Sequence, residues 1–445
     1  MSYYQSLCIL SALAITIAFL NPYLMKMQTT IAITSGALLI SVLMLVVGKT
    51  LWPELEQFAI DLLSTINFTD FVLEGVLGFL LFAGGLGINL QALKSQKWEI
   101  TVLVLFGVLA STVLVAAGLW GLCWLLGVTI PFVYCLLFGA LISPTDPIAV
   151  LAIVKKLGAP EQIAIQIEGE SLFNDGIGLV VFLSIYAAAF SSADASPGAV
   201  SELFLHETLG GLLFGGLLGL VAHLMISVTN ESAIELAVTL CIPTAGFAVA
   251  NLLGVSGALA MVVAGIMVGN WTRYSGFSKT SESFLDEFWH FLDEFLNALL
   301  FLLIGLAMMV VQFHRELMLL ILFAIPLVLL ARFVSVALPY LLFRCFRHYH
   351  SHSVRLLTWG GLRGALSLAM AISVPAGIGV GAHGLYDLRN VIVTMTYSVV
   401  LFSIIVQGMT VGPMIRRAKR VESENSLREE SGESVPPAAA GWPSR

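Results

Sequence analysis

Three carboxylates lie close together in one apolar stretch, in the sequence Glu168-Gly169-Glu170-Ser171-Leu172-Phe173-Asn174-Asp175, with no lysine or arginine beside them. Inside a bilayer, each acidic side chain at a helix centre costs about 2.5–3.5 kcal/mol on insertion scales. Such residues are found where they have a partner or a use, and they commonly mark an ion or proton path. The residue types therefore predict binding of protons or cations within a membrane.

Helical spacing places these polar groups on one half of the predicted helix. At about 100° per residue, Glu168, Ser171 and Asp175 form one stripe. Glu170 and Asn174 form an adjacent stripe. We expect this half of the helix to face a water-filled cavity or other polar segments. The alternative is a fully paired polar cluster that only holds helices together.

A second polar sequence, Ser143-Pro144-Thr145-Asp146-Pro147, lies halfway along the preceding apolar stretch. Each proline removes a backbone donor and clashes with the preceding helical turn, so a continuous helix is not expected here. Irregular backbone at membrane depth is tolerated where it is buried in protein or lines a cavity. The interruption would place Asp146 and free carbonyl groups near the middle of the membrane.

A third sequence, Trp359-Gly360-Gly361-Leu362-Arg363-Gly364, predicts another interrupted helix. Arg363 and Arg332 are the two arginines that fall within apolar stretches. A buried charge left unpaired is strongly destabilising, so Arg363 needs a counter-charge. Glu170 or Glu168 is the expected partner, and a structural role for Arg363 is favoured over direct contact with a substrate.

The elements that position these residues are membrane helices. Of the 445 residues, 58% are hydrophobic and 11% charged, against about 25% charged residues in soluble domains. Stretches of about 20 apolar residues, long enough to cross the hydrocarbon core, recur along the chain. The expected fold is an all-α polytopic membrane protein. Its thirteen transmembrane helices are predicted at 6–24, 31–48, 70–90, 99–127, 131–154, 163–190, 206–229, 232–252, 255–270, 286–312, 316–343, 354–376 and 389–413. Residues 49–69 predict an additional helix at the membrane interface.

The basic residues indicate how these helices are oriented. With the N-terminus outside, fourteen basic residues fall in cytoplasmic loops or the C-terminal flank: Lys26, Lys94, Lys97, Lys155, Lys156, Arg273, Lys279, Arg344, Arg347, Arg355, Arg416, Arg417, Lys419 and Arg420. Only Lys49, Arg315 and Arg389 fall on the opposite side. Cytoplasmic loops are enriched in lysine and arginine. We therefore expect a multi-pass protein of the cell (inner) membrane with a cytoplasmic C-terminus.

If the seventh span is a linker, the other twelve spans divide into two six-helix halves of opposite orientation. We therefore expect a membrane domain at 1–420, with inverted repeats at 1–205 and 230–420 and a linker helix at 206–229. Residues 421–445, rich in Glu, Ser and Pro, predict a disordered cytoplasmic tail. The two interrupted helices are the fifth member of each half. Paired interruptions at corresponding positions are typical of the binding site of a secondary transporter.

These motifs resemble those of the NhaP/NHE-type monovalent cation:proton antiporters. Besides the three sequences above, the resemblance includes Ser256-Gly257-Ala258-Leu259-Ala260 and Leu296-Asn297-Ala298-Leu299-Leu300-Phe301. It implies a 13-helix inverted-repeat fold with two crossed discontinuous helices. It also implies a core domain that moves against a dimerisation domain, a homodimer in the lipid bilayer, and transport rather than enzymatic activity. No cofactor and no nucleic-acid partner are expected.

The resemblance also implies roles for individual residues. Asp175 would bind the cation and the proton in alternation. Thr145, Ser171 and Asp146 would contribute oxygen atoms or organise the site. A single titrating acid of this kind can trade one proton for one monovalent cation.

The resemblance assigns the remaining motif residues to support of the site. Asn174 would hold the broken helix in place, and Glu170 and Arg363 would form a structural ion pair, with Glu168 nearby. An Asn-Asp pair accompanies electroneutral exchange in this family, so exchange of Na+ or K+, and possibly Li+, for H+ is expected at a ratio of 1:1.

One position departs from the family pattern. Many relatives have an acidic residue before a Gly-Gly pair in the third span, where this chain has Ala83. Glu74 lies nine residues earlier, about 13 Å along a helix, too far to substitute simply. The site would lack one hard oxygen ligand, which makes a K+-selective K+/H+ antiporter a rival to a sodium exchanger.

Other classes of function remain open from the residues alone. A cation channel could use similar acids, but neither a filter ring nor an arginine-rich sensor helix is present. An intramembrane aspartyl protease needs two facing aspartates, for which Asp146 and Asp175 qualify, but its Gly-x-Gly-Asp context is missing. A non-transporting sensor is a further alternative.

Two other clusters of charged or titratable residues have both a functional and a purely structural interpretation. His348, His350 and His352 could sense pH or bind a metal, although a solvated loop is favoured. A second group on the cytoplasmic side could draw cations inward or simply cap a helix start; it consists of Asp286, Glu287, His290, Asp293 and Glu294.

Overall fold

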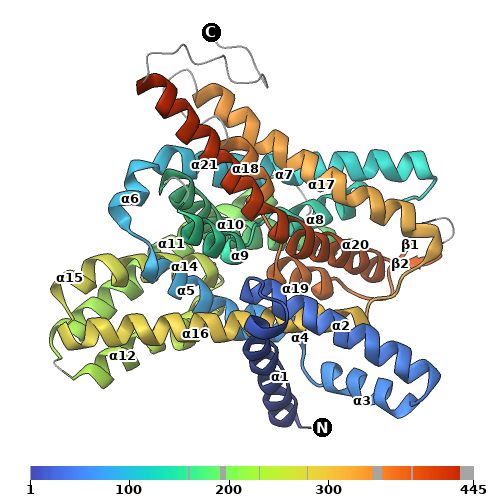
Figure 1. Cartoon of the computed structure of the whole chain (residues 1–445), viewed down its shortest axis with the longest axis horizontal. Coiled ribbons are helices and arrows are strands. Elements are labelled where there is room, and N and C mark those ends of the chain that lie inside the picture. The colour runs from blue at the N-terminus through green and yellow to red at the C-terminus, as the bar shows by residue number, and fades with distance from the viewer. Residues whose placement is uncertain are drawn as a thin grey trace.

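The computed structural model describes residues 2–158, 161–190, 197–229, 231–277, 279–343, 353–381 and 384–430. Helices dominate this part of the chain, as predicted (Figure 1). Its two strands, β1 (Gly379–Val380) and β2 (Tyr386–Asp387), form one short antiparallel pair in which Gly379 is opposite Asp387. The predicted all-α class is therefore confirmed.

Up to residue 229, the described residues form eleven α-helices and one π-helical segment. They are α1 (Tyr3–Leu24), α2 (Thr29–Thr50), α3 (Pro53–Ser64), α4 (Phe68–Asp70), η1 (Phe71–Val76), α5 (Leu77–Gly87), α6 (Leu90–Ser95), α7 (Lys97–Leu126), α8 (Phe132–Ile142), α9 (Ile148–Leu157), α10 (Glu161–Phe190) and α11 (Pro197–Ser227). Helix α3 lies within residues 49–69, where a short helix was expected.

The second half continues with the same kind of element. It comprises α12 (Ser232–Cys241), η2 (Ile242–Gly246), α13 (Phe247–Leu252), α14 (Gly257–Met267), η3 (Val268–Thr272), α15 (Arg273–Ser275), α16 (Lys279–Leu306), η4 (Ala307–Met309), η5 (Arg315–Leu317), α17 (Met318–Phe343), α18 (Ser353–Gly360), α19 (Ala365–Ser373), α20 (Leu388–Phe402), η7 (Ser403–Gln407) and α21 (Gly408–Glu430). Helix α21 runs ten residues past the boundary predicted at 420, and residues 431–445 lie outside the described residues, as does the histidine cluster at 348–352.

Ten helices of the described chain are long and apolar enough to cross a membrane. Each coincides with one of the thirteen predicted spans. The other three predicted spans, 131–154, 255–270 and 354–376, are built from shorter pieces. Two of these three are the spans with proline or glycine interruptions, where a long uninterrupted helix was not expected.

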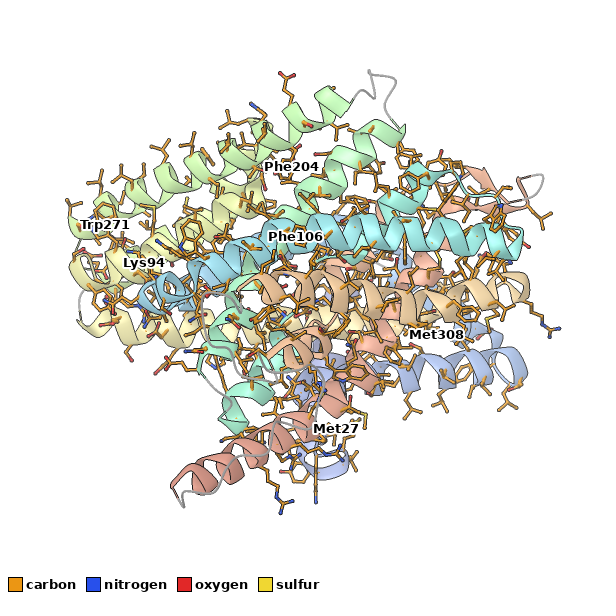
Figure 2. All side chains as sticks on the ribbon, turned by 90° about the horizontal axis from the view of Figure 1, so that it is seen from above. Met27, Lys94, Phe106, Phe204, Trp271 and Met308 are labelled. Carbon is orange, nitrogen blue, oxygen red and sulfur yellow. The ribbon has the colours of Figure 1, made fainter. Side chains whose placement is uncertain are left out.

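Apolar side chains cover both the inside and the outside of the helical assembly. On the outer helices many are exposed, among them Phe106 on α7 (Figure 2). Val113 on α7 and Leu213 on α11 are exposed as well. A soluble protein rarely leaves so large an apolar surface uncovered. This surface suits contact with lipid, in agreement with the composition.

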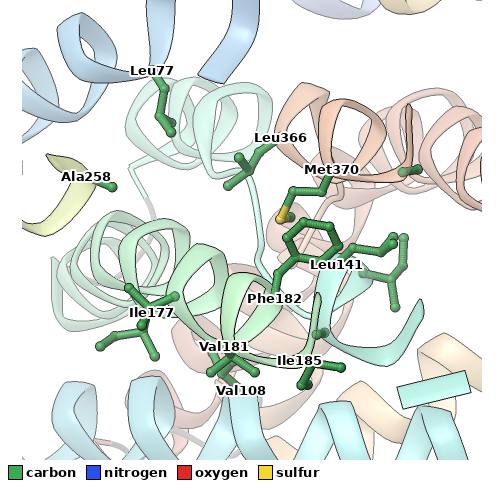
Figure 3. Close-up of a cluster of buried hydrophobic side chains, with 14 of the residues drawn as sticks. Leu77, Val108, Leu141, Ile177, Val181, Phe182, Ile185, Ala258, Leu366 and Met370 are labelled. Atoms are coloured by element: carbon green, nitrogen blue, oxygen red, sulfur yellow. The ribbon is translucent and has the colours of Figure 1, made fainter. Parts of the chain in front are cut away.

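The interior packs the interrupted helices against α10. Phe182 of α10 lies among Leu141 of α8 and Met370 of α19, and all three side chains are buried (Figure 3). Helix α7 packs along both α8 and α10, while α17 packs along α7. Because protein interiors are close-packed and deform little, this core fixes where the two interruptions meet.

Candidate functional site

The first interruption lies between α8 and α9. Helix α8 ends at Ile142 and α9 begins at Ile148, so the break contains both prolines, as predicted. The N–H of Ile148 donates to a carboxylate oxygen of Asp146 over 3.0 Å. The first N–H groups of a helix have no partner within the helix and carry partial positive charge. Asp146 therefore stabilises the start of α9.

The second interruption, between Gly360 and Ala365, crosses the first. The backbone N–H of Asp146 donates to the carbonyl of Leu362 over 2.8 Å, which joins the two breaks as a short antiparallel bridge. Gly364 is required by this approach, because a Cβ atom at that position would collide with the Asp146 carboxylate. The two predicted discontinuous helices therefore cross at their breaks.

Arg363 faces the open end of α8 instead of a glutamate. Its guanidinium donates to two backbone carbonyls, that of Ser143 and, over 2.7 Å, that of Pro144. The backbone N–H of Arg363 donates to the Ser403 hydroxyl over 2.9 Å. The last carbonyls of a helix lack partners within the helix and carry partial negative charge. The counter-charge of Arg363 is therefore the carboxyl end of α8.

The expected ion pair between Glu170 and Arg363 is wrong, because Glu170 pairs with Arg332 of α17. Both side chains of this pair are almost fully buried. Arg332 also donates to the carbonyl of Leu357, near the end of α18, over 3.3 Å. The sequence marked Arg332 only as an arginine within a span. Nothing along the chain indicates which of two buried arginines meets the glutamate.

The other buried polar residues of α10 are tied to the first break. The hydroxyls of Thr145 and Ser171 lie 3.1 Å apart. The Asn174 amide donates to Thr145 over 3.5 Å and to Glu170 over 3.2 Å. Asn174 thus bridges α10, the interrupted helix and the ion pair.

A cavity of about 1540 Å³ reaches the same region from one side of the molecule. Asp146 and Asp175 are half-buried and lie in its wall. Lys155, Lys156 and Arg416 also line it, so it opens on the side that the basic residues assign to the cytoplasm. The two aspartates are close enough to interact electrostatically. A carboxylate that water can reach in this way can exchange protons and cations with solution.

The polar half of α10 is thus divided between two environments. Glu168 and Asp175 line the cavity, and Glu168 pairs with Lys155 over 3.2 Å nearer the opening. Glu170, Ser171 and Asn174 are buried against the break. The sequence predicted a cavity and a paired cluster as alternatives for this half of the helix. The structure has both, and Ser171 is buried although the helical spacing places it on the stripe of Glu168 and Asp175.

The acidic group on α16 lines the same cavity. Asp286, His290, Asp293 and Glu294 contribute to its wall, whereas Asp286 also pairs with Arg273 of α15. Asn297, one turn after Asp293, is part of the wall as well. Sequence reasoning noted the acids but gave Asn297 no role, because an isolated asparagine in an apolar helix carries no signal of its own.

Comparisons with known proteins agree with this architecture. The chain matches the family described as "Sodium/hydrogen exchanger, transmembrane" over residues 10–417. It is 38% identical to the Na(+)/H(+) antiporter NhaP of Pseudomonas aeruginosa over 411 residues, which cover 91% of this chain and 95% of that protein. It is 33% identical to the Na(+)/H(+) antiporter NhaH of Halobacillus aidingensis, with 84% of this chain and 89% of that protein covered.

A solved structure shows the same fold. The sodium proton antiporter MjNhaP1 of Methanocaldococcus jannaschii superposes with a TM-score of 0.71 at 19% sequence identity, over 94% of this chain and 99% of that chain. The match of the family over nearly the whole chain, together with crossed breaks and an aspartate in a deep cavity, leads to one conclusion. This chain belongs to the family of transmembrane sodium/hydrogen exchangers.

Proposed function

We propose that this protein is a secondary active transporter that exchanges Na+ for H+ across the cell membrane. The observation that carries the proposal is the position of Asp175, which lies in the wall of a deep cavity while its polar neighbours on α10 are held in a buried network. The relatives described above are named for the exchange of Na+ and H+. Those names favour sodium over the K+-selective alternative suggested by Ala83.

In this proposal, Asp175 and Asp146 contact the ion. Protons and Na+ compete for Asp175, so the form that carries either one has lost the carboxylate's negative charge and can move through the protein. The empty, charged form is held back by the cost of burying an unpaired charge. Thr145 and Ser171, whose hydroxyls bond to each other, organise the break and do not line the cavity. One carboxylate that alternates between one proton and one Na+ gives electroneutral exchange.

The proposal extends to topology and assembly. We infer that the three predicted spans made of shorter pieces also cross the membrane, which gives thirteen crossings with the N-terminus outside and the C-terminus in the cytoplasm. Residues 1–205 and 230–420 are then inverted repeats on either side of α11. Alternating access follows from movement of the domain with the crossed breaks against the rest of the protein, in a homodimer, as the family resemblance implies.

Exchange in proteoliposomes tests the function. Vesicles that contain a pH-sensitive dye should show proton flux when Na+ is added, and Asp175→Asn should reduce that flux to the level of empty vesicles. Asp70→Asn is a matched control, because Asp70 is an exposed carboxylate outside the cavity wall and its loss should leave the flux unchanged. Flux at the wild-type rate in Asp175→Asn would refute the role of Asp175. An electrical current carried by Na+ without any movement of protons would identify a channel instead of an exchanger.

A further inference from the structure

A stripe of three side chains on α16 lines the cavity opposite the ion site. Trp289, Asp293 and Asn297 are four residues apart and all contribute to the cavity wall. Residues at this spacing lie above one another on one face of a helix. The three side chains therefore form one stripe along the cavity wall.

The amide oxygen of Asn297 has no hydrogen-bond donor that explains its burial. The Asn297 side chain is 2% exposed, and its amide oxygen accepts no hydrogen bond from any described residue. A buried polar group without a partner costs about 1–3 kcal/mol. The Asp293 carboxylate lies within reach of the amide N–H group of Asn297. The amide oxygen of Asn297, in the wall of the cavity and without a donor, is suited to a cation that enters the cavity.

Asp293 differs from the other acids around the cavity. Glu168 pairs with Lys155, Asp286 pairs with Arg273, and Glu294 lies 3.9 Å from the ring of His290. Within the described ranges, the structure has no ion pair for Asp293.

The charged groups close enough to Asp293 to affect it are His290 and Glu294 on its own helix and Asp146 at the break. Two of these three can carry negative charge. The surroundings of Asp293 therefore favour a positively charged ligand over an empty site.

Helix α5 contributes no side-chain oxygen to the cavity wall. Helix α5 is held beside α16 by Phe82, whose ring centroid lies 4.8 Å from that of Trp289. The residues that follow Phe82 in the cavity wall are Ala83 and Gly84. Between α5 and α16, the side-chain oxygen ligands for an ion therefore come from α16.

We propose that Asp293 and Asn297 form a second cation-binding site, where Na+ sheds part of its water before it reaches Asp146 and Asp175. The carboxylate of Asp293 and the amide oxygen of Asn297 are the hard oxygen ligands that such an ion accepts, and water in the cavity completes its coordination. The inference rests on the proposed exchange function and deepens it. It assigns to α16 the first specific contact on the cytoplasmic side.

Kinetics of exchange from the cytoplasmic side tests the site. Asp293→Asn should raise the KM for Na+ by about tenfold, the equivalent of about 1.4 kcal/mol of binding, and leave the maximal rate within a factor of about two. Asn297→Ala should act in the same direction and add little to Asp293→Asn, because both residues serve one ion.

Glu294→Gln is the matched control, because it removes the same charge at the next residue. The Glu294 side chain is 73% exposed. If the acids only attract cations at long range, both variants should raise KM equally and the effect should fade at high salt. Equal effects, or an unchanged KM in Asp293→Asn, would overturn the second site.

Direct binding separates this inference from the function it rests on. Sodium NMR of the purified protein should show line broadening that persists in Asp175→Asn and disappears in the double variant Asp175→Asn with Asp293→Asn. Wild-type protein without Na+-dependent proton flux would refute the exchanger. If the wild-type protein exchanges Na+ for H+ but the sodium line broadening is the same with and without Asp293→Asn, the second site alone is refuted.

Discussion

The two polar stripes of α10 show how one helix can serve both structure and transport. Glu170 and Asn174 are buried and bonded to Arg332 and Thr145. Asp175, the residue next to Asn174, lies in the wall of a water-accessible cavity. The chemistry of a carboxylate is the same on both stripes. The group that each carboxylate faces, a buried arginine or the cavity, therefore determines whether it serves structure or ion binding. A paired acid fixes the fold, and an acid that faces the cavity is available to ions.

The same division accounts for the charges at the crossed breaks. Arg363 stabilises the carboxyl end of α8, and Asp146 stabilises the amino end of α9. Breaking a helix in a membrane exposes two ends with opposite partial charge. Each end is met here by a side chain of the opposite sign, which allows irregular backbone to persist beside the ion site.

Removal of the buried acid should have the largest effect on stability. Glu170→Gln leaves the Arg332 guanidinium buried without its counter-charge, so we expect a loss of about 3–5 kcal/mol. Thermal unfolding of the purified protein in detergent would measure it. Glu168→Gln is the control on the cavity stripe, because its pair with Lys155 is partly exposed and such pairs contribute about 0–1 kcal/mol. Equal stability of the two variants would contradict the distinction between the stripes.

A smaller effect is expected from a hydroxyl in the first break, which contacts the buried residues of α10. Thr145→Val keeps the shape of the side chain but removes the bond to Ser171 and the acceptor for Asn174. The expected loss of stability is about 1 kcal/mol per hydrogen bond, with exchange reduced but still present. Thr16→Val serves as the control, since Thr16 is exposed and bonds only to its own helix. If Thr145→Val abolished exchange without loss of stability, Thr145 would be assigned direct contact with the ion.

Local signals predicted much of this architecture. The prolines at 144 and 147 and the glycines around Arg363 identified both breaks, because their backbone effects do not depend on the rest of the fold. Composition predicted the membrane helices for the same reason. The last span was predicted at 389–413, and α21, with which it ends, continues to Glu430.

Pairing between distant segments was beyond the sequence. Glu170 and Arg332 are 162 residues apart, and the choice between Arg332 and Arg363 depends on how α17 and α18 pack. The carbonyls that bind Arg363 belong to the backbone. Every residue has such a group, so the residue types cannot predict which carbonyls accept from Arg363. The role inferred for Asn297 likewise depends on a cavity that forms only when α5, α10 and α16 come together.

Release of protons on addition of Na+ tests the central claim most directly. Purified protein in weakly buffered detergent, near the pH at which Asp175 is protonated, should release one proton for each Na+ bound at Asp175, and Asp175→Asn should release none. The Na+ concentration needed should rise as the pH falls, by about tenfold per pH unit under full competition. Sodium binding at Asp175 without release of a proton, or with an affinity independent of pH, would contradict the account.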